Sequence, residues 1–387
     1  MDLMFSVMLG ITQQKNKRHK LDMRKDSAEM RITMSEYLGK LHESAVRFPQ
    51  TDIWMDSCGE EELNYGLERG IVGATSNPII VGSVIKNELN IWEARIKELI
   101  KEMNDATEDE IAWALIHEIG ALRSKKLLPV FEKYNGKKGR LSIQTNAKYY
   151  RNKDKMVEQA MVLNALGSNM QVKMPAGAAG IAAMEEVTYR GVSINATVSF
   201  TVAQAVAVAE AVERGLKRRE AEGLSTDEMA PVCTIMIGRT DDWMKAYVAK
   251  NGMVVKPEAL EWAGVAVIKE AYRIFTERGY RTKLLSAANR NVYHFSELVG
   301  GNLAQTINYS WHKRLNACDV TVEDRIQIPV IEDYMKELQK IPEFKKAFDE
   351  DGMKMEEFEK CGGFRDTLTT FMAGYDDLCK LIRGYMI

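Results

Sequence analysis

The residue with the most distinctive chemical potential is Lys173, which lies among apolar neighbours in the stretch Gln171-Val172-Lys173-Met174-Pro175. This composition is typical of a short strand that ends at a proline. A buried ammonium group loses solvation, so its pKa falls, and the resulting neutral amine can attack a carbonyl and form a Schiff base. Lys173 is therefore a candidate nucleophile. The other interpretation is an ordinary strand lysine that points into solvent, because strand side chains alternate between faces.

The elements around this lysine follow a regular pattern from residue 52 onward. Short apolar segments alternate with longer amphipathic ones, which predicts βαβ units and a parallel sheet. We expect strands at residues 53–55, 72–74, 141–143, 172–174, 192–194, 234–237, 283–285 and 303–306. Eight strand–helix units are the number that closes a (β/α)8 barrel, the TIM-barrel form of the α/β class.

The barrel is expected to span residues 51–331, between an N-terminal extension (1–50) and additional C-terminal helices (332–387). The extension is rich in Lys, Arg and Met and runs into a predicted helix near 34–48. The C-terminal part predicts helices at 343–348 and 364–385, which could cap the barrel or contact a partner subunit.

Two segments depart from a minimal barrel. Residues 81–138 are long for one crossover and predict two or three helices. Residues 214–230 are highly charged and are expected to form an exposed, loop-like insertion before the sixth strand.

Active sites of such barrels lie at the C-terminal ends of the strands, so polar residues at those positions are the candidates. Some have structural explanations too: Asp56 can cap a helix and Asn77, before Pro78, can form a turn. Together they provide an amine, a carboxylate, amides, hydroxyls and two guanidiniums, which suits a phosphorylated polyhydroxy carbonyl compound. The candidates are Asp56, Thr75, Asn77, Gln144, Lys173, Asn195, Thr197, Thr234, Arg239 and Arg290.

Several ordered segments resemble the motifs of the transaldolases. They are Asp52-Ile53-Trp54-Met55-Asp56, Gly73-Ala74-Thr75-Ser76-Asn77-Pro78, Gln171-Val172-Lys173-Met174-Pro175, Asn195-Ala196-Thr197, Gly238-Arg239-Thr240-Asp241-Asp242-Trp243 and Ser296-Glu297-Leu298-Val299-Gly300-Gly301. The resemblance covers roughly residues 52–316. It implies a barrel whose Schiff-base lysine lies on the fourth strand, and here that residue is Lys173.

The resemblance also implies roles for the other candidates. Asp56 would take the proton from a substrate hydroxyl when the carbon–carbon bond breaks, and Thr197 would hold a catalytic water. The two guanidiniums would bind a terminal phosphate, which suits their forked donors. The substrate-binding positions are then Thr75, Asn77, Asn195, Thr234, Arg239 and Arg290.

Some positions depart from the family pattern. Gln144, in Gly139-Arg140-Leu141-Ser142-Ile143-Gln144, replaces the glutamate of transaldolases and resembles the glutamine of the fructose-6-phosphate aldolase branch. Met236 stands where that branch has a tyrosine and transaldolases have a phenylalanine. Ala288 and Thr234 replace two serines of the phosphate site, which removes one phosphate contact.

These features lead to three hypotheses about function. The first is a transaldolase-like enzyme that transfers a three-carbon dihydroxyacetone unit between sugar phosphates. The second, favoured by Gln144, is an aldolase that releases dihydroxyacetone. The third is a lapsed barrel that only binds a sugar phosphate or serves in an assembly.

Composition gives expectations about binding partners, cofactors and localisation. The net charge of −2, from 53 Lys and Arg against 55 Asp and Glu, predicts binding neither to nucleic acid nor to an anionic membrane. Five scattered cysteines and five separated histidines show no metal-ligand spacing, so we expect no metal or other cofactor. A mildly apolar start with no preceding basic residue indicates a cytoplasmic protein. The family resemblance predicts a homo-oligomer.

Overall fold

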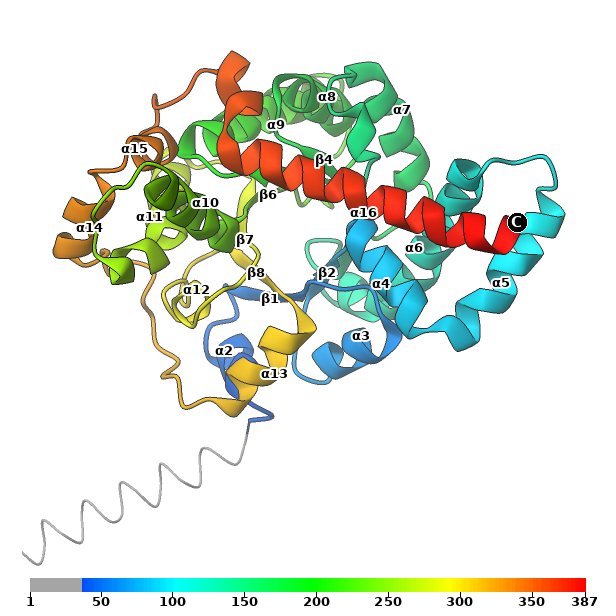
Figure 1. The fold of residues 1–387 in the computed structure, drawn as a ribbon, viewed down its shortest axis with the longest axis horizontal. Coiled ribbons are helices and arrows are strands. Elements are labelled where there is room, and N and C mark those ends of the chain that lie inside the picture. Colours follow the sequence, from blue (N-terminus) through cyan, green and yellow to red (C-terminus); the bar gives the residue numbers. More distant parts are fainter. Residues whose placement is uncertain (1–36) are drawn as a thin grey trace, which may run out of the picture.

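The computed structural model describes residues 37–387, and its centre is a closed barrel of eight parallel strands (Figure 1). The pairing of the first strand with the last, from Asp52 beside Ala304 to Met55 beside Ile307, closes the barrel. The predicted (β/α)8 barrel is thus confirmed. In chain order the strands are β1 (Asp52–Met55), β2 (Gly73–Thr75), β3 (Arg140–Gln144), β4 (Met170–Pro175), β5 (Ile194–Ser199), β6 (Val232–Ile235), β7 (Lys283–Ser286) and β8 (Ala304–Ile307).

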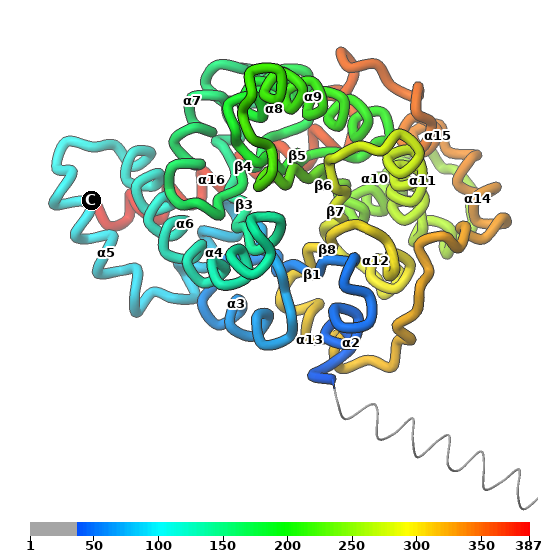
Figure 2. Tube along the Cα trace, turned by 180° about the vertical axis from the view of Figure 1, so that it is seen from behind, coloured from blue at the N-terminus to red at the C-terminus, as the bar shows by residue number. Residues whose placement is uncertain are grey.

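Helices surround the barrel and cover its strands (Figures 1 and 2). Three of them, α4, α5 and α6, fill the long connection between β2 and β3, as the sequence predicts. Thr107 begins α6 with a capping box, in which its hydroxyl accepts from the Glu110 amide and the Glu110 carboxylate accepts in return. The helices up to β8 and just after it are α2 (Lys40–Arg47), α3 (Glu60–Leu67), α4 (Pro78–Asn87), α5 (Leu89–Glu102), α6 (Glu108–Lys133), α7 (Lys153–Asn164), α8 (Ala178–Tyr189), α9 (Val202–Ala221), α10 (Ile237–Lys250), α11 (Ala263–Arg278), α12 (Tyr293–Ser296) and α13 (Tyr309–Ala317), with the 3-10 turns η1 (Ala147–Tyr149) and η2 (Pro257–Glu261).

The structure corrects two expected strand positions and one expected loop. The fifth strand begins two residues later than 192, because the chain turns at Gly191, whose φ is 93°, and the Val192 amide bonds back to Val187. The sixth strand ends at Ile235, and residue 237 already starts α10. Residues 214–230 were expected to form a loop, but this interpretation is wrong for residues 214–221, because α9 continues through them to Ala221. Its charged residues lie on a helix surface, where Arg214 pairs with Glu185 at 2.7 Å.

The first helix of the described residues begins later than predicted. The described part of the expected helix 34–48 is α2, which begins at Lys40. The start of that prediction and most of the N-terminal extension lie outside the described residues.

The C-terminal helices are α14 (Glu332–Leu338), α15 (Pro342–Phe348) and α16 (Gly362–Met386), with the turn η3 (Met355–Lys360). The longest of them, α16, crosses one end of the barrel (Figures 1 and 2). Lys148, just after β3, pairs with Asp376 of α16 at 2.8 Å, and Arg239, just after β6, donates to Thr367 of α16 at 3.4 Å. Because both partners follow the ends of strands, α16 covers the C-terminal end of the barrel.

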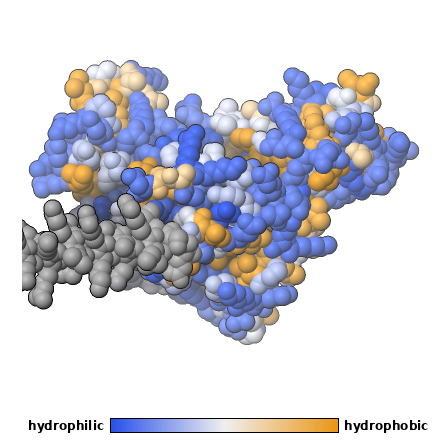
Figure 3. All heavy atoms as spheres, turned by 90° about the horizontal axis from the view of Figure 1, so that it is seen from below, coloured by the Kyte–Doolittle hydropathy of each residue, from blue (hydrophilic) through white to orange (hydrophobic). Residues whose placement is uncertain are grey.

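The surface mixes hydrophilic and hydrophobic residues on the face shown in Figure 3, where hydrophilic ones predominate. Large apolar side chains that are exposed, such as Val254, come from separate segments of the chain. Among the helices of the described residues, none is both long enough and apolar enough to span a bilayer.

Inside the barrel, the indole ring of Trp54 packs against the backbone of Gly73. A Cβ atom at this glycine would lie 2.5 Å from a ring carbon of Trp54. The same ring belongs to an apolar layer with Val232, Leu285 and Ala304. The absence of a side chain at residue 73 therefore allows the layer below the polar strand ends to close.

We predict that Gly73→Ala lowers the free energy of unfolding by about 1–3 kcal/mol, because the indole ring has to move within a packed layer. The matched control is Gly82→Ala in α4, where a Cβ would meet no atom within 4 Å. That change should raise stability by about 0.5–1 kcal/mol, because alanine favours helices. Urea unfolding of the three proteins measures both effects, and equal effects at the two glycines would contradict the packing argument.

Candidate active site

Lys173 lies on β4 with 4% of its surface exposed, inside the C-terminal end of the barrel. Its strand neighbours in register are Gln144 on β3 and Asn195 on β5. Its amine makes no hydrogen bond or ion pair within the described part of the chain. Burial lowers the pKa of Lys173 and Arg239 lowers it further, while the carboxylate of Asp56 opposes both. The amine is therefore shifted toward its neutral, nucleophilic form.

Asp56 follows β1 directly and is held by Thr75 on β2, which is itself bonded to a threonine on β8. The hydroxyl of Thr75 donates to Asp56 Oδ1 at 2.6 Å. Thr75 also lies 2.6 Å from the hydroxyl of Thr306 on β8, which must be the donor because the Thr75 proton is already used. Burial raises the pKa of Asp56, against the opposing effects of Lys173, the Thr75 hydrogen bond and Arg239. A carboxyl group balanced in this way can both accept and return a proton.

Gln144 and Thr197 each bring an unpartnered oxygen into the same end of the barrel. Gln144 is 3% exposed and Thr197 is fully buried. Neither Gln144 Oε1 nor Thr197 Oγ1 has a hydrogen-bond partner in residues 37–387. A buried polar oxygen without a partner is costly, so these atoms suit a bound water or substrate.

Asn195 is the centre of a hydrogen-bonded chain through the barrel. Its side-chain nitrogen donates to Ser142 Oγ at 3.0 Å, and its oxygen accepts from Thr234 at 2.7 Å. Ser142 donates in turn to Gln171, which donates to the backbone oxygen of Ala230 at 2.8 Å. The amide of Asn195 is thus fixed in orientation beside Lys173.

The two candidate phosphate ligands lie close enough that Arg290 lowers the pKa of Arg239. Arg239 is on α10, rather than on the sixth strand, and its guanidinium also lies 5.7 Å from the ring centre of Phe371 on α16. Arg290 follows β7, is 38% exposed, and forms an ion pair with Asp242 at 2.9 Å. Two neighbouring guanidiniums with one carboxylate between them leave a surplus of positive charge for an anion.

A buried aspartate–histidine pair holds the backbone of Arg290. His294 Nε2 lies 2.8 Å from Asp241 Oδ2, and both side chains are fully buried. His294 Nδ1 accepts from the Arg290 amide at 3.0 Å, so Nε2 carries the proton. Asp241 also accepts from the Gly264 amide at 2.8 Å. This pair ties the loop after β7 to α10 and α11.

Asn77 begins α4, and its side-chain oxygen caps the helix by accepting from the Ile80 amide at 3.0 Å. This structural role is a helix cap rather than the turn that the sequence offered as an alternative, and the side-chain nitrogen of Asn77 stays available for a substrate. As for metals, residues 37–387 contain no group of three or more His, Cys, Asp or Glu that could hold one.

Comparison with known proteins agrees with the barrel fold. Residues 53–382 match the family model described as transaldolase/fructose-6-phosphate aldolase. The chain belongs to that family. It is 27% identical to a transaldolase of Thiobacillus denitrificans over 339 residues, which cover 80% of this chain and 88% of the relative. A transaldolase of Acidothermus cellulolyticus is 26% identical over 63% of this chain and 66% of its own length. A transaldolase of Mycobacterium tuberculosis is 26% identical over 60% of this chain and 64% of its own length.

In this member of the transaldolase/fructose-6-phosphate aldolase family, several supporting residues escaped the sequence-based prediction. Ser142 and Thr306 lie at positions whose inward direction depends on strand register, and His294 meets Asp241 from 53 residues away. One signal was available for two of these residues. Strand side chains alternate between faces, so Ser142 and Gln171, two positions before Gln144 and Lys173, are expected to point to the same side as those residues. Nothing local to Phe371 indicates that α16 brings it to Arg239.

The charges around Lys173 predict opposite pKa shifts in two variants. Asp56→Asn removes a charge that raises the pKa of Lys173, so this pKa should fall. Arg239→Met removes a charge that lowers it, so the pKa should rise. Reductive methylation with formaldehyde, followed across pH by peptide mass spectrometry, reports the neutral amine. The pH at which the rate of Lys173 methylation begins to rise should be lower in Asp56→Asn and higher in Arg239→Met.

The control for this measurement is Asp242→Asn, an exposed carboxylate that pairs with Arg290 and does not contribute to the pKa of Lys173. Its profile should coincide with that of the unchanged protein. Shifts in the same direction for Asp56→Asn and Arg239→Met would contradict the electrostatic account.

Proposed function

We propose that the protein transfers a three-carbon dihydroxyacetone unit between sugar phosphates through a Schiff base on Lys173. The observation that carries this proposal is a buried lysine amine that has no hydrogen-bond partner among residues 37–387 and is electrostatically coupled to the partly buried carboxyl group of Asp56. Such a pair supplies the nucleophile and the base that a retro-aldol reaction requires. Membership of the family and its transaldolase relatives support the same reaction.

The chemistry follows from these two groups. The neutral amine of Lys173 adds to the carbonyl carbon of a ketose phosphate, and loss of water gives an imine. Once protonated, the imine accepts the electron pair of the bond between the α and β carbons as that bond breaks. Asp56 takes the proton of the hydroxyl on the departing carbon, so an aldehyde leaves and an enamine stays on the lysine. The enamine carbon then attacks an acceptor aldehyde, whose new alkoxide regains the proton from Asp56.

The surrounding residues would hold the substrate and the water. Gln144 Oε1 and Thr197 Oγ1 provide acceptors for the water that leaves and returns during imine formation and hydrolysis. Asn195, Thr75 and the side-chain nitrogen of Asn77 would bind the hydroxyls of the three-carbon unit. Arg239 and Arg290, with Thr234 nearby on β6, would bind the terminal phosphate.

Gln144 favours a second candidate, an aldolase that releases dihydroxyacetone. Its side chain is an amide, which cannot shuttle a proton as a carboxylate does. A third candidate is a lapsed barrel that binds sugar phosphates without turnover. The free amine of Lys173 and the hydrogen-bonded Asp56 favour an enzyme over this one.

One product assay separates these candidates. The protein receives fructose 6-phosphate with and without erythrose 4-phosphate, and free dihydroxyacetone is measured against sedoheptulose 7-phosphate. A transaldolase forms the seven-carbon product and little dihydroxyacetone, whereas an aldolase releases dihydroxyacetone with or without acceptor. Absence of both products, in a protein that still binds fructose 6-phosphate, would overturn the proposal of an enzyme. Lys173→Ala is the control that shows the background.

We predict that Gln144→Glu changes the ratio of transfer to release in favour of transfer. A carboxylate beside the water can move protons in the steps that form and reprotonate the imine, and such groups contribute about 10²–10⁴-fold to rates. The same assay gives the ratio. Thr145→Ser, which alters the next buried residue on the chain without adding a charge, should leave it unchanged. A ratio unaffected by Gln144→Glu would place Gln144 away from the reactive water.

A further inference from the structure

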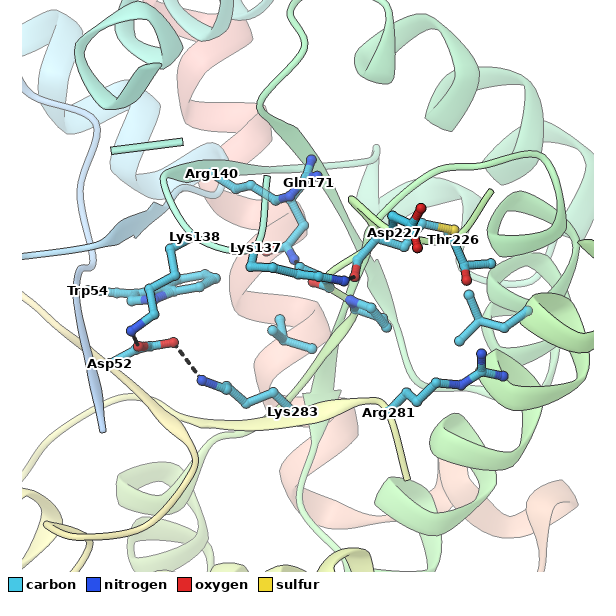
Figure 4. A pocket seen from close by; sticks show the side chains of 15 residues that line it. Asp52, Trp54, Lys137, Lys138, Arg140, Gln171, Thr226, Asp227, Arg281 and Lys283 are labelled. Atoms are coloured by element: carbon cyan, nitrogen blue, oxygen red, sulfur yellow. Dashed lines mark hydrogen bonds and ion pairs between the residues drawn. The ribbon is translucent and has the colours of Figure 1, made fainter. Parts of the chain in front are cut away.

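A cavity of about 370 Å³ opens at the N-terminal end of the barrel, opposite the end that contains Lys173. Its lining includes residues that begin four of the strands: Asp52, Arg140, Val232 and Lys283. Residues of the segment 226–231 form another wall, so the charged segment before β6 closes over this end. Figure 4 shows how these side chains approach from separate parts of the fold.

The cavity lining carries more positive than negative charge. Among its residues, five are basic and two are acidic: Lys137, Lys138, Arg140, Arg281 and Lys283 against Asp52 and Asp227. Asp52 is shared by Lys138 at 2.6 Å and Lys283 at 2.7 Å, so one of these two charges is not balanced there (Figure 4). Arg281 is balanced outside the cavity by Glu213 and Glu220.

Two further cations in the lining have no carboxylate within ion-pair distance in the described part of the chain. The exposed ammonium of Lys137 bonds only to the Met229 carbonyl at 3.2 Å. Arg140 is 6% exposed and donates only to the backbone oxygens of Gly136, Met170 and Glu228. Burial disfavours the charge of Arg140, and the carboxylate of Glu228, beyond ion-pair distance, offsets only part of this cost, so an anion that reaches this cavity would be stabilised.

Most of the other lining residues are apolar, among them Trp54, Leu216, Met229 and Val232, whereas Gln171 and Thr226 are polar. Trp54 is 4% exposed, and its indole N–H has no acceptor in residues 37–387. The volume lies in the range of about 300–1,000 Å³ that is usual for small-molecule sites. A cavity with an apolar wall and unbalanced cations at its opening suits an organic anion better than a free inorganic one.

We propose that this cavity is a second ligand site, which binds a small organic phosphate whose non-phosphate part packs on the apolar wall. The phosphate lies between Lys137 and the two lysines on Asp52, within reach of Arg140. A phosphate fits this surplus of positive charge better than a carboxylate does, because a phosphate carries a second negative charge and three acceptor oxygens. The site is separate from the catalytic end and does not depend on the reaction proposed there.

Gln171 connects the two ends of the barrel. It lines the cavity, and its hydrogen bonds lead through Ser142 to Asn195 beside Lys173. Changes at Gln171 would therefore act on both sites. For this reason the test measures binding rather than activity and leaves Gln171 in place.

The test is isothermal titration calorimetry of the full chain at low ionic strength with adenosine monophosphate, with adenosine and inorganic phosphate as comparison ligands. Adenosine monophosphate should bind more tightly than either. Lys137→Glu should weaken it by on the order of tenfold or more, since it reverses an exposed charge and breaks one bond to a backbone carbonyl. The affinity of Lys137→Met for adenosine monophosphate should lie between those of the unchanged protein and of Lys137→Glu.

Two controls locate the site. Lys125→Glu makes the same charge change on the exposed face of α6, away from the cavity, and should alter affinity by less than about twofold. Arg239→Ala/Arg290→Ala removes the proposed phosphate ligands at the catalytic end and should leave the binding intact. Loss of binding in that double variant, equal effects of the two lysine changes, or no binding of adenosine monophosphate at all would each overturn the proposal.

Discussion

Burial of the Lys173 amine without a hydrogen-bond acceptor is the constraint on which the candidate active site depends. Desolvation favours the neutral amine, and Arg239 adds to this effect. The carboxyl group of Asp56 opposes it but is itself desolvated, so neither group can fully stabilise the charge of the other. Thr75 holds Asp56 in place, and Thr306 in turn bonds to Thr75. The barrel therefore keeps a nucleophile and a carboxyl group close together: the lower pKa of Lys173 favours its neutral amine, and the higher pKa of Asp56 makes its carboxylate a stronger base.

The closed sheet and the C-terminal helix produce this burial together. The strands bring Gln144, Lys173 and Asn195 to one level, because their registers align across β3, β4 and β5. Helix α16 then crosses the C-terminal end and contacts Arg239. A helix in that position limits access of water to the amine, and exclusion of water strengthens the electrostatic interactions within the site.

The fold was predictable because its main signals are local. Each strand is a short apolar run, and eight such runs with intervening helices indicate a barrel. Its boundaries were less predictable: β5 begins at Ile194 because of the turn at Gly191, which apolar content alone does not reveal. The charged end of α9 was mistaken for a loop because ion pairs such as Arg214 with Glu185 connect residues that are 29 positions apart.

For the candidate site too, residues within a local sequence pattern were predictable, and residues brought in from distant segments were not. Lys173 and Asp56 were predictable, since each lies at a strand end within a segment that resembles a family motif. Thr306, His294 and Phe371 were not, because their positions depend on barrel closure, on the loop after β7 and on the path of α16. The cavity at the other end of the barrel also escaped prediction. It is formed by residues from distant parts of the sequence, such as Asp52, Arg140 and Lys283.

The central claim is that Lys173 is the nucleophile, and covalent trapping tests it most directly. The protein is incubated with fructose 6-phosphate, reduced with borohydride and digested, and the peptides are analysed by mass spectrometry. The account predicts a reduced dihydroxyacetone adduct on the peptide that contains Lys173, and none in Lys173→Ala. An adduct on another lysine, or equal labelling of Lys173→Ala, would contradict it.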